Sequence, residues 1–282
     1  MNGRTVGLAT WEGLPDLVAD DRLVLGPLLE RGLRATPVVW SESAPDPAAL
    51  DLVVIRSTWD YHHRRDAFLR WSENLGRRTR VLNDPATLRW NSDKRYLADL
   101  AARGLPVVPT VWGREVDSAT ATLAEHRWTR AVLKPCVSAS GEGATILRAG
   151  EPERNEMALE RLRSRGEVML QPFLEATVDP GERSLVYLDG RFSHAVLRAP
   201  KFADRRTVTE GARVEASGVE LDVAARTLGT VRPTPLYARV DLVAVDGSPH
   251  LMELELIEPL LYLAAQPGAA ERFAAAIATR LA

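Results

Sequence analysis

Two strand-like segments near the C-terminal end of the chain, joined by a short turn, constrain the fold more than any other part of the sequence. They read YARVDLVAV and PHLMELEL, and Asp246-Gly247 between them is a strong signal for a β-hairpin. Apolar and polar residues alternate at period two in the second segment, which is typical of a strand with one buried face. The C-terminal part of the chain is therefore predicted to contain an antiparallel sheet.

The register of this hairpin follows from its apolar residues. Val240 and Leu242 have to share the buried face with Leu254 and Met252, because a slip of one residue would move the whole apolar set to the solvent side. The pairing that satisfies this condition places Val240 opposite Leu254 and Leu242 opposite Met252.

The same pairing gathers charged side chains on the other face of the hairpin. It places Asp241 opposite Glu253 and Arg239 opposite Glu255. Like charges directly across a sheet are destabilising, and burying them without partners costs still more. Mg²⁺ would relieve this repulsion, because it takes carboxylate oxygens as ligands and fills its other positions with water or with the phosphates of a nucleotide. An acidic, solvent-exposed sheet face is the alternative that the sequence leaves open.

The chain as a whole reads as a mixed α/β and α+β protein of three parts. Residues 1–88 alternate short strands and helices, which predicts a small doubly wound domain. Residues 89–170 predict a small α+β lid, and residues 171–282 predict the antiparallel sheet. Strands are expected at 5–10, 35–40, 50–57, 80–83, 107–112, 130–135, 144–149, 167–174, 183–188 and 191–199, and helices at 16–33, 64–77, 83–106, 117–127, 152–165 and 268–281.

Composition excludes several functional classes. The 36 basic and 38 acidic residues give a net charge of −2, so neither a nucleic-acid-binding stripe nor a polybasic membrane anchor is expected. No run approaches the roughly 20 apolar residues of a membrane span. Cys136 is the single cysteine, so no disulfide can form within the chain, and a cytoplasmic location is expected. We interpret Cys136 as a small buried residue rather than a nucleophile.

The stretch LKPCVSASGEGATIL is typical of a phosphate-binding loop. Lys134 ends an apolar strand, and Ser140, Gly141 and Gly143 lie in a small-residue turn before the next strand. Successive backbone N–H groups in such a turn form an anion-binding nest, and a lysine beside it adds positive charge. A Walker loop is excluded, because its spacing differs and it leads into a helix. An ordinary hairpin loop is the alternative.

Two further stretches are compatible with nucleotide binding. In SDKRYLADL, Ser92 is predicted to cap a helix and Lys94 to lie in its first turn, where the helix dipole disfavours a cation unless an anion is bound nearby. A surface lysine is the alternative. In MLQPFLEATVDPGERSLVYL, the strand ends at Gln171 and Pro172, which leaves backbone groups free for an adenine edge. An interdomain linker is the alternative there.

The stretch IRSTWDYHHRR follows a buried strand at its carboxyl end, where open α/β sheets place their ligands. Arg56 could bind a substrate carboxylate, and Ser57, Thr58 and Asp60 could contact an amine. A polar loop that serves packing is an equally good interpretation.

The adjacent histidines His62 and His63 in this loop are expected to point apart, so they are not predicted to form a metal-binding pair.

Taken in order, SDKRYL, VLKPCVSASGEG, LQPFLEATVDPGERSLVY, RAPKF and YARVDLV…LMELELIEP resemble the ATP-grasp ligases, and the resemblance covers the whole chain. It implies a pre-ATP-grasp domain on the substrate side, a lid, and a C-terminal sheet with the metal site. It also implies ATP and two Mg²⁺ ions, with Mn²⁺ as a possible substitute. DDRLVLGPLLERG, VVIRSTWDYHHRRDAFLRW and ELELIEP are similar to the cyclo-ligases of cycloserine biosynthesis, which close O-ureido-D-serine into a ring.

The resemblance also implies roles for the residues that match the family's motifs. Those expected at the nucleotide are Lys94 and Lys134 at the phosphates, Ser140, Gly141 and Gly143 in the loop over them, Gln171, Phe173 and Leu174 at the adenine, and Glu182 at the ribose. Those expected at the metal are Asp241, Glu253 and Glu255; those expected in catalysis are Arg239, which stabilises the transferring phosphoryl group, and Lys201, which reaches the triphosphate. Glu258 is expected at the substrate ammonium. The motif Glu253-Leu254-Glu255 departs from the Glu-x-Asn of many members.

The expected activity is that of an ATP-dependent ligase for a small amino-acid-like carboxylate. The carboxylate becomes an acyl phosphate, and a nitrogen of the same molecule captures it with ring closure. Ligation of a separate amine to an amino acid or peptide is one alternative, and a non-catalytic nucleotide-binding module is another. No nucleic-acid or membrane partner is expected, and the chain is expected to be a monomer or homodimer.

Overall fold

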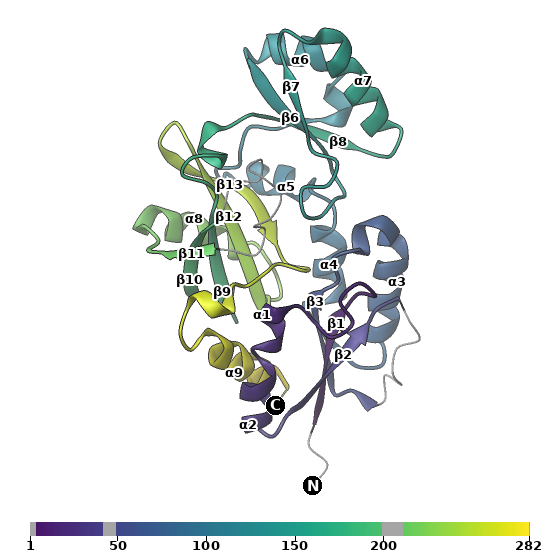
Figure 1. Cartoon of the computed structure of the whole chain (residues 1–282), viewed down its shortest axis with the longest axis vertical. Helices are drawn as coiled ribbons and strands as arrows, with labels where there is room; N and C mark the ends of the chain where they lie inside the picture. Colours follow the sequence, from purple (N-terminus) through teal and green to yellow (C-terminus); the bar gives the residue numbers. More distant parts are fainter. Residues whose placement is uncertain (1–3, 42–48, 199–210, 282) are drawn as a thin grey trace.

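The computed structural model describes residues 4–41, 49–198 and 211–281, and three β-sheets in these residues set the architecture (Figure 1). A parallel sheet near the N-terminus lies at the bottom of the view, a five-stranded sheet in the middle, and a small antiparallel sheet at the top. The mixed α/β fold expected from the sequence is confirmed. None of the helices in the described ranges combines the length and the apolar character needed to cross a membrane.

The N-terminal sheet is parallel and has the strand order β2-β1-β3-β4. All six residues of β3 are buried, as the apolar run LVVI predicts for a central parallel strand. The strands are β1 (Thr5–Thr10), β2 (Arg34–Val39), β3 (Leu52–Ser57) and β4 (Arg80–Leu82); the helices are α1 (Ala19–Arg22), α2 (Leu25–Glu30), α3 (Arg65–Gly76) and α4 (Pro85–Asn91).

Two helices expected to be continuous are each broken in two. The segment 16–33 forms α1 and α2, because Pro27 fits the first turn of a helix but would clash with the carbonyl of Leu23 in a continuous one. The segment 83–106 forms α4 and α5 (Tyr96–Ala102). Between them, the backbone N–H of Lys94 donates to the Cys136 carbonyl, 2.8 Å away, instead of to a helical partner.

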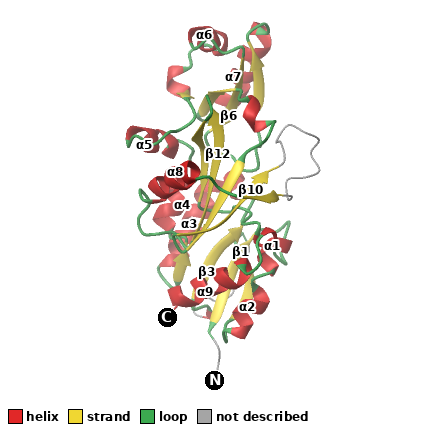
Figure 2. Ribbon diagram, turned by 90° about the vertical axis from the view of Figure 1, so that its left-hand side faces the viewer, coloured by secondary structure: helices red, strands yellow, loops and turns green. Residues whose placement is uncertain are grey.

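The top sheet is antiparallel, with the order β5-β8-β6-β7, and it has an apolar core of its own. Helices α6 and α7 pack on it, and Figure 2 shows this unit projecting away from the rest of the molecule. Its elements are β5 (Val111–Trp112), α6 (Ala119–Glu125), β6 (Arg130–Pro135), β7 (Thr145–Arg148), α7 (Pro152–Arg163) and β8 (Val168–Pro172).

The middle sheet is antiparallel, with the order β11-β10-β9-β12-β13. Both predicted hairpins are present, whereas β11 and α8 were not expected. Helix α8 begins with a capping box formed by Ser217 and Glu220. The elements are β9 (Arg183–Leu188), β10 (Arg191–Arg198), β11 (Gly211–Val214), α8 (Gly218–Leu228), β12 (Tyr237–Val245), β13 (Ser248–Glu255) and α9 (Ala269–Leu281).

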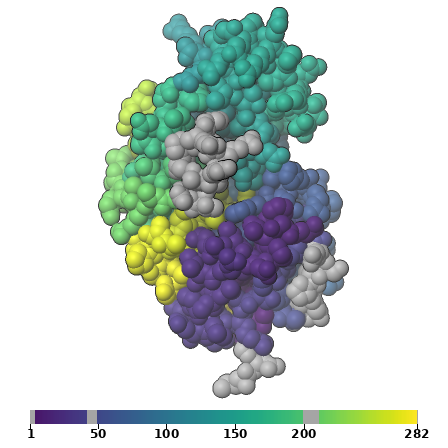
Figure 3. All heavy atoms as spheres, in the orientation of Figure 1, coloured from purple at the N-terminus to yellow at the C-terminus, as the bar shows by residue number. Residues whose placement is uncertain are grey.

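The middle sheet and the N-terminal domain share one core. Helix α9 packs against α2, and Figure 3 shows this yellow segment directly beside the purple N-terminal residues. The buried Asn83 amide donates to the carbonyls of Tyr237 and Leu256 at 3.0 and 2.8 Å and accepts from the N–H of Leu236 at 2.7 Å. These bonds tie the loop after β4 to both strands that carry the acidic residues.

The predicted register of the last hairpin is confirmed at three pairs and wrong at the fourth. Arg239 lies opposite Glu255, Val240 opposite Leu254 and Asp241 opposite Glu253. A bulge after Asp241 then pairs Leu242 with Leu251 rather than with Met252. Because a bulge places two residues of one strand against one of the other, Met252 leaves the main apolar face and packs beside Val108 and Val243.

The proposed domain boundaries at 88/89 and 170/171 stay predictions. Strand β8 runs two residues beyond the second of them, to Pro172.

Candidate functional site

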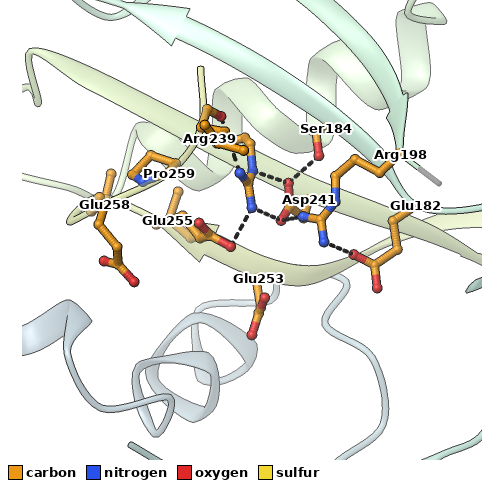
Figure 4. Close-up of polar contacts among 12 residues, drawn as sticks. Glu182, Ser184, Arg198, Arg239, Asp241, Glu253, Glu255, Glu258 and Pro259 are labelled. Atoms are coloured by element: carbon orange, nitrogen blue, oxygen red, sulfur yellow. Dashed lines mark hydrogen bonds and ion pairs between the residues drawn. The ribbon is translucent and has the colours of Figure 1, made fainter. Parts of the chain in front are cut away.

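Three carboxylates meet on one face of the β12–β13 hairpin (Figure 4). Asp241, Glu253 and Glu255 each offer an oxygen within 4.8 Å of the other two. Asp241 is completely buried, and the two glutamates are partly buried. The register predicted from the sequence therefore brings together the residues expected at the metal.

Asp241 is surrounded by donors. Its Oδ1 accepts from Arg239 Nε at 2.9 Å and Ser184 Oγ at 2.6 Å, and its Oδ2 accepts from Arg239 Nη2 at 3.0 Å and Arg198 Nη1 at 2.6 Å. Burial alone would raise the pKa of Asp241, but the two guanidinium groups hold it below its ordinary value. Asp241 is thus kept ionised in a buried position.

Glu255 is in the opposite electrostatic situation. It accepts a hydrogen bond from Arg239 Nη2. Burial raises the pKa of Glu255, and repulsion from Asp241 and Glu253 adds to this, while Arg239 opposes it. The face therefore holds more negative charge than its own cations neutralise at Glu255, which is the condition under which a divalent cation would bind.

Arg198 is a residue of this site that the sequence analysis missed. Besides Asp241, its guanidinium contacts Glu182 at 3.1 Å, and its side chain is only 13% exposed. The Asp189-Gly190 turn alone would align Arg198 with Gly181 in the β9–β10 hairpin. A register shift between Phe192 and His194 moves the pairing by one residue, so the backbone N–H of Arg198 donates to the Glu182 carbonyl at 2.9 Å.

Lys94 links the acidic face to the loop between β6 and β7. Its Nζ donates to the Ser138 carbonyl at 2.6 Å and lies 3.5 Å from a carboxylate oxygen of Glu253. The prediction that Ser92 is a helix N-cap is wrong, because Ser92 is the C-cap of α4. Lys94 precedes α5 instead of lying in its first turn. The lysine nevertheless lies beside both the predicted phosphate-binding loop and the predicted metal site.

The second lysine lies on the lid side of the same region. Lys134 Nζ donates to Gln171 Oε1 at 2.8 Å and lies 3.6 Å from Met252 Sδ. Gln171 Nε2 in turn donates to Thr110 Oγ1 at 3.0 Å. Leu174 packs with Met252 in the small apolar cluster between the lid and the middle sheet.

Phe173 lies against the guanidinium of Arg130, 4.1 Å from ring centroid to Cζ.

The glycine-rich loop, residues 138–143, has three residues in the left-handed region of the backbone, and its role as an anion-binding nest stays a prediction. Ser140, Gly141 and Gly143 have φ values of 52°, 72° and 77°. A Cβ at Gly143 would lie 2.8 Å from Pro135 Cγ. Glycine is therefore needed there both for its positive φ and for the space that it leaves.

The residues expected at the substrate lie mostly in packed surroundings. Arg56 is 1% exposed; it contacts Asp21 at 2.8 Å and donates to the Pro259 carbonyl at 2.8 Å, and its contact with a substrate carboxylate stays a prediction. Ser57 Oγ donates to Thr10 Oγ1 at 3.1 Å.

Two other residues of this loop differ in their surroundings. Asp60 accepts from Trp40 Nε1 at 2.6 Å and from Arg64 Nη2 at 3.0 Å. Thr58 is completely buried, and its hydroxyl has no hydrogen-bond partner within the part of the chain that the structure describes.

Glu258 follows β13, and Figure 4 shows its side chain extending to the same side of the sheet as that of Glu253. Burial raises the pKa of Glu258 to about 8, with the negative charge of Glu255 adding to the shift.

Lys201 lies outside the described residues.

The prediction that the two adjacent histidines point apart is wrong. His62 and His63 do not point apart: their ring centroids are 4.0 Å apart, and the Nε2 atoms of both lie near one oxygen of Glu142 in the glycine-rich loop. These three side chains form a second group, in which each residue offers one possible metal-ligand atom and these atoms lie within 4.8 Å of one another.

Two family models match the chain. Residues 6–83 match the N-terminal domain of D-cycloserine synthetase DcsG, and residues 106–233 match the ATP-grasp domain of prokaryotic glutathione synthetase. The cycloserine biosynthesis protein DcsG of Streptomyces lavendulae is 33% identical over 279 residues, covering 90% of this chain and 93% of the relative.

Solved structures agree with these matches. The crystal structure of D-cycloserine synthetase DcsG superposes with a TM-score of 0.90 at 31% identity, over 99% of this chain and 100% of the other. The ATP complex of D-alanine–D-alanine ligase from Bacillus anthracis has a TM-score of 0.70 at 15% identity, over 100% of this chain and 97% of that one. The second similarity is one of fold.

Proposed function

The chain belongs to the ATP-grasp ligases, in the family of D-cycloserine synthetase, and from this premise we propose that it closes an O-ureido-serine-like amino acid into a ring at the expense of ATP. It is an ATP-dependent carbon–nitrogen ligase. The substrate and the intramolecular step are our proposal. They are supported by similarity to D-cycloserine synthetase over nearly the full length of both chains.

The acidic face fits Mg²⁺. Asp241, Glu253 and Glu255 supply the hard oxygen donors that this ion prefers, within 4.8 Å of one another. We propose that they hold two ions bound together with ATP. When bound, Mg²⁺ would neutralise the charge that builds up on the phosphates during transfer.

We assign the cationic side chains to the same phosphates. We propose that Lys94 and Lys134 bind them from two sides, that the backbone N–H groups of Ser140 to Gly143 cover them, and that Lys201 reaches the triphosphate. Lys94 supports this assignment, because it already contacts both the glycine-rich loop and Glu253.

The adenosine is assigned to the junction between lid and middle sheet. Gln171, Phe173 and Leu174 would contact the adenine, where Leu174 and Met252 provide an apolar surface. Glu182, held by Arg198, would accept hydrogen bonds from the ribose hydroxyls.

The chemistry has two steps. A carboxylate oxygen of the substrate attacks the γ-phosphorus of ATP, the bond to the bridging oxygen breaks, and ADP leaves. A nitrogen of the same molecule then attacks the acyl carbon, and phosphate leaves. Arg239, buried between Asp241 and Glu255, is positioned to stabilise the charge on the phosphoryl group and on the acyl oxygen. Ring closure is favoured, because the nitrogen is already at high effective concentration.

Glu258 is the best candidate for the amine end of the substrate. A carboxyl group with a pKa of about 8 exchanges its proton readily near neutral pH. We propose that it contacts the substrate amine and takes up the proton that the attacking nitrogen releases.

The observation that carries the ligase assignment is the meeting of three carboxylates, Arg239 and Lys94 beside the glycine-rich loop. The test measures ADP release with amino-acid-like carboxylates, including both enantiomers of O-ureido-serine, and identifies the product by mass spectrometry. A cyclic product is expected.

Two other results would contradict ring closure. ADP release that requires a separate amine would favour intermolecular ligation. ATP binding without turnover on any carboxylate would favour the non-catalytic module.

A further inference from the structure

The glycine-rich loop is attached to the N-terminal domain at a place that the proposed chemistry does not use. Glu142, near the end of the loop, accepts a hydrogen bond from His62 Nε2 at 2.9 Å, and His63 Nε2 lies 3.5 Å from the same oxygen. The His62 side chain is 9% exposed, whereas those of His63 and Glu142 are 55% and 60% exposed. One buried ring and one exposed ring therefore share a single carboxylate.

Apolar packing holds the same loop at a second point. Ala139 is 6% exposed and belongs to the apolar cluster of the N-terminal domain that includes Trp40, Tyr61 and Phe68. Tyr61 directly precedes the two histidines, so residues 61–63 both contribute to this apolar cluster and supply the polar contact. The contact is thus more than one surface ion pair.

A third contact fixes the start of the loop. Lys94 Nζ donates to the Ser138 carbonyl at 2.6 Å and to the Ser138 hydroxyl at 3.2 Å. The loop is consequently held at Ser138, Ala139 and Glu142, while Ser140 and Gly141, both with positive φ, form the tip between these points.

We propose that Glu142, His62 and His63 form a clasp that docks the glycine-rich loop on the N-terminal domain, and that they act as positioning residues for the loop over the ATP phosphates. The consequence for catalysis rests on the proposed function, whereas the docking itself rests on the contacts alone. The hydrogen bond from His62 also lowers the pKa of Glu142, with the field of His63 contributing, so the carboxylate stays charged.

The exposure of the clasp explains how it can serve a turnover cycle. Exposed ion pairs are weak individually, so a clasp of this kind favours the docked loop without locking it. A loop that covers the phosphates must open for nucleotide exchange and close to keep water from the acyl phosphate. The clasp joins that closure to the loop after β3, which carries the residues considered for the substrate side.

The docking is tested by hydrogen exchange of residues 138–143 in the full-length protein without nucleotide. Glu142→Ala should exchange several-fold faster than the wild type in this segment. Glu142→Gln keeps an acceptor for His62 and should stay close to the wild type. Glu125→Ala, which removes an exposed glutamate at the end of α6, is the matched control and should change nothing here. Unchanged exchange in Glu142→Ala would overturn the clasp.

The positioning role is tested by the kinetics of the same variants. Glu142→Ala and His62→Ala should raise KM for ATP several-fold and increase the ADP formed per molecule of product, because water then reaches the acyl phosphate. Glu142→Gln should restore most of the coupling. Faster exchange with unchanged KM and coupling would overturn the positioning role.

The two proposals fail in different ways. If the wild type releases no ADP with any carboxylate, the proposed function fails, while hydrogen exchange still decides whether the clasp exists.

Discussion

Replacing Arg198 by methionine should reveal how the acidic face is balanced without metal. Methionine keeps most of the length and packing of the side chain but removes the charge from Asp241, 2.6 Å away, and from Glu182, 3.1 Å away. Removing one partner of a buried ion pair costs about 3–5 kcal/mol. Because Asp241 keeps Arg239, we expect a loss of about 3 kcal/mol in the free energy of unfolding.

The same variant should become more sensitive to Mg²⁺ than the wild type. In the wild type, the described part of the site sets Asp241, Glu253, Glu255 and Glu182 against Lys94, Arg198 and Arg239, which leaves an excess of one negative charge. Without Arg198 that balance shifts by one negative charge. If 10 mM Mg²⁺ is about ten times its dissociation constant, binding to the folded state adds RT ln 11, about 1.4 kcal/mol.

Thermal unfolding followed by circular dichroism measures both effects. At about 2 °C per kcal/mol for a chain of this size, the midpoint should fall by about 6 °C and recover by about 3 °C in Mg²⁺, with NaCl at matched ionic strength as the reference. Arg213→Met is the matched control, because its ion pair with Glu215 is exposed and should contribute little. The reasoning is refuted if both variants are equally stable, or if Mg²⁺ raises the midpoint of both by the same amount.

Three other substitutions test the site in different ways. Glu255→Ala should abolish ADP formation while the circular dichroism spectrum stays that of the wild type; unaltered turnover would remove Glu255 from the metal site. Because the pKa of Glu258 is raised to about 8, the folded state holds that proton more tightly than the unfolded state, so this group makes stability fall between about pH 5 and pH 8. Glu258→Gln should therefore lose this slope, at most about 1.4 kcal/mol per pH unit, in urea unfolding at pH 5.5 and 8; equal slopes in both proteins would argue against the shift. Gly143→Ala puts a Cβ 2.8 Å from Pro135 Cγ at a φ of 77°, so KM for ATP should rise several-fold and stability should fall by about 1 kcal/mol or more, and an unaffected KM would show that the loop tolerates the strain.

The acidic face could be predicted because its cause is local. Alternation in one hairpin fixes which side chains share a face, and the pairs from Arg239–Glu255 to Asp241–Glu253 follow from it. The same rule fails at Met252, because a bulge depends on backbone pairing that residue types do not reveal. Arg198 was missed for the same reason, since the shift near Phe192 decides that it meets Glu182 rather than Gly181.

Long-range contacts account for other features that the sequence could not show. Sequence pattern suggests one helix from Asn83 to Pro106, but the backbone of Lys94 is bound to Cys136 in the lid, a contact that periodicity cannot show. Arg56 lies near the carboxyl end of a buried strand, and the sequence left both a substrate contact and a packing role open for it. Its partner Asp21 comes from α1, 35 residues earlier, and the pair is completely enclosed.

The hydrogen bonds of the Asn83 side chain have a consequence for how the molecule moves. Because this single amide joins the first domain to the ends of both strands that carry the acidic residues, the parallel sheet and the acidic hairpin are held together as one base. The lid has a core of its own and joins this base through a few contacts, among them the Lys94–Cys136 backbone bond and those of the glycine-rich loop. If these contacts release during nucleotide exchange, we expect the arrangement of the base to stay assembled from one catalytic cycle to the next.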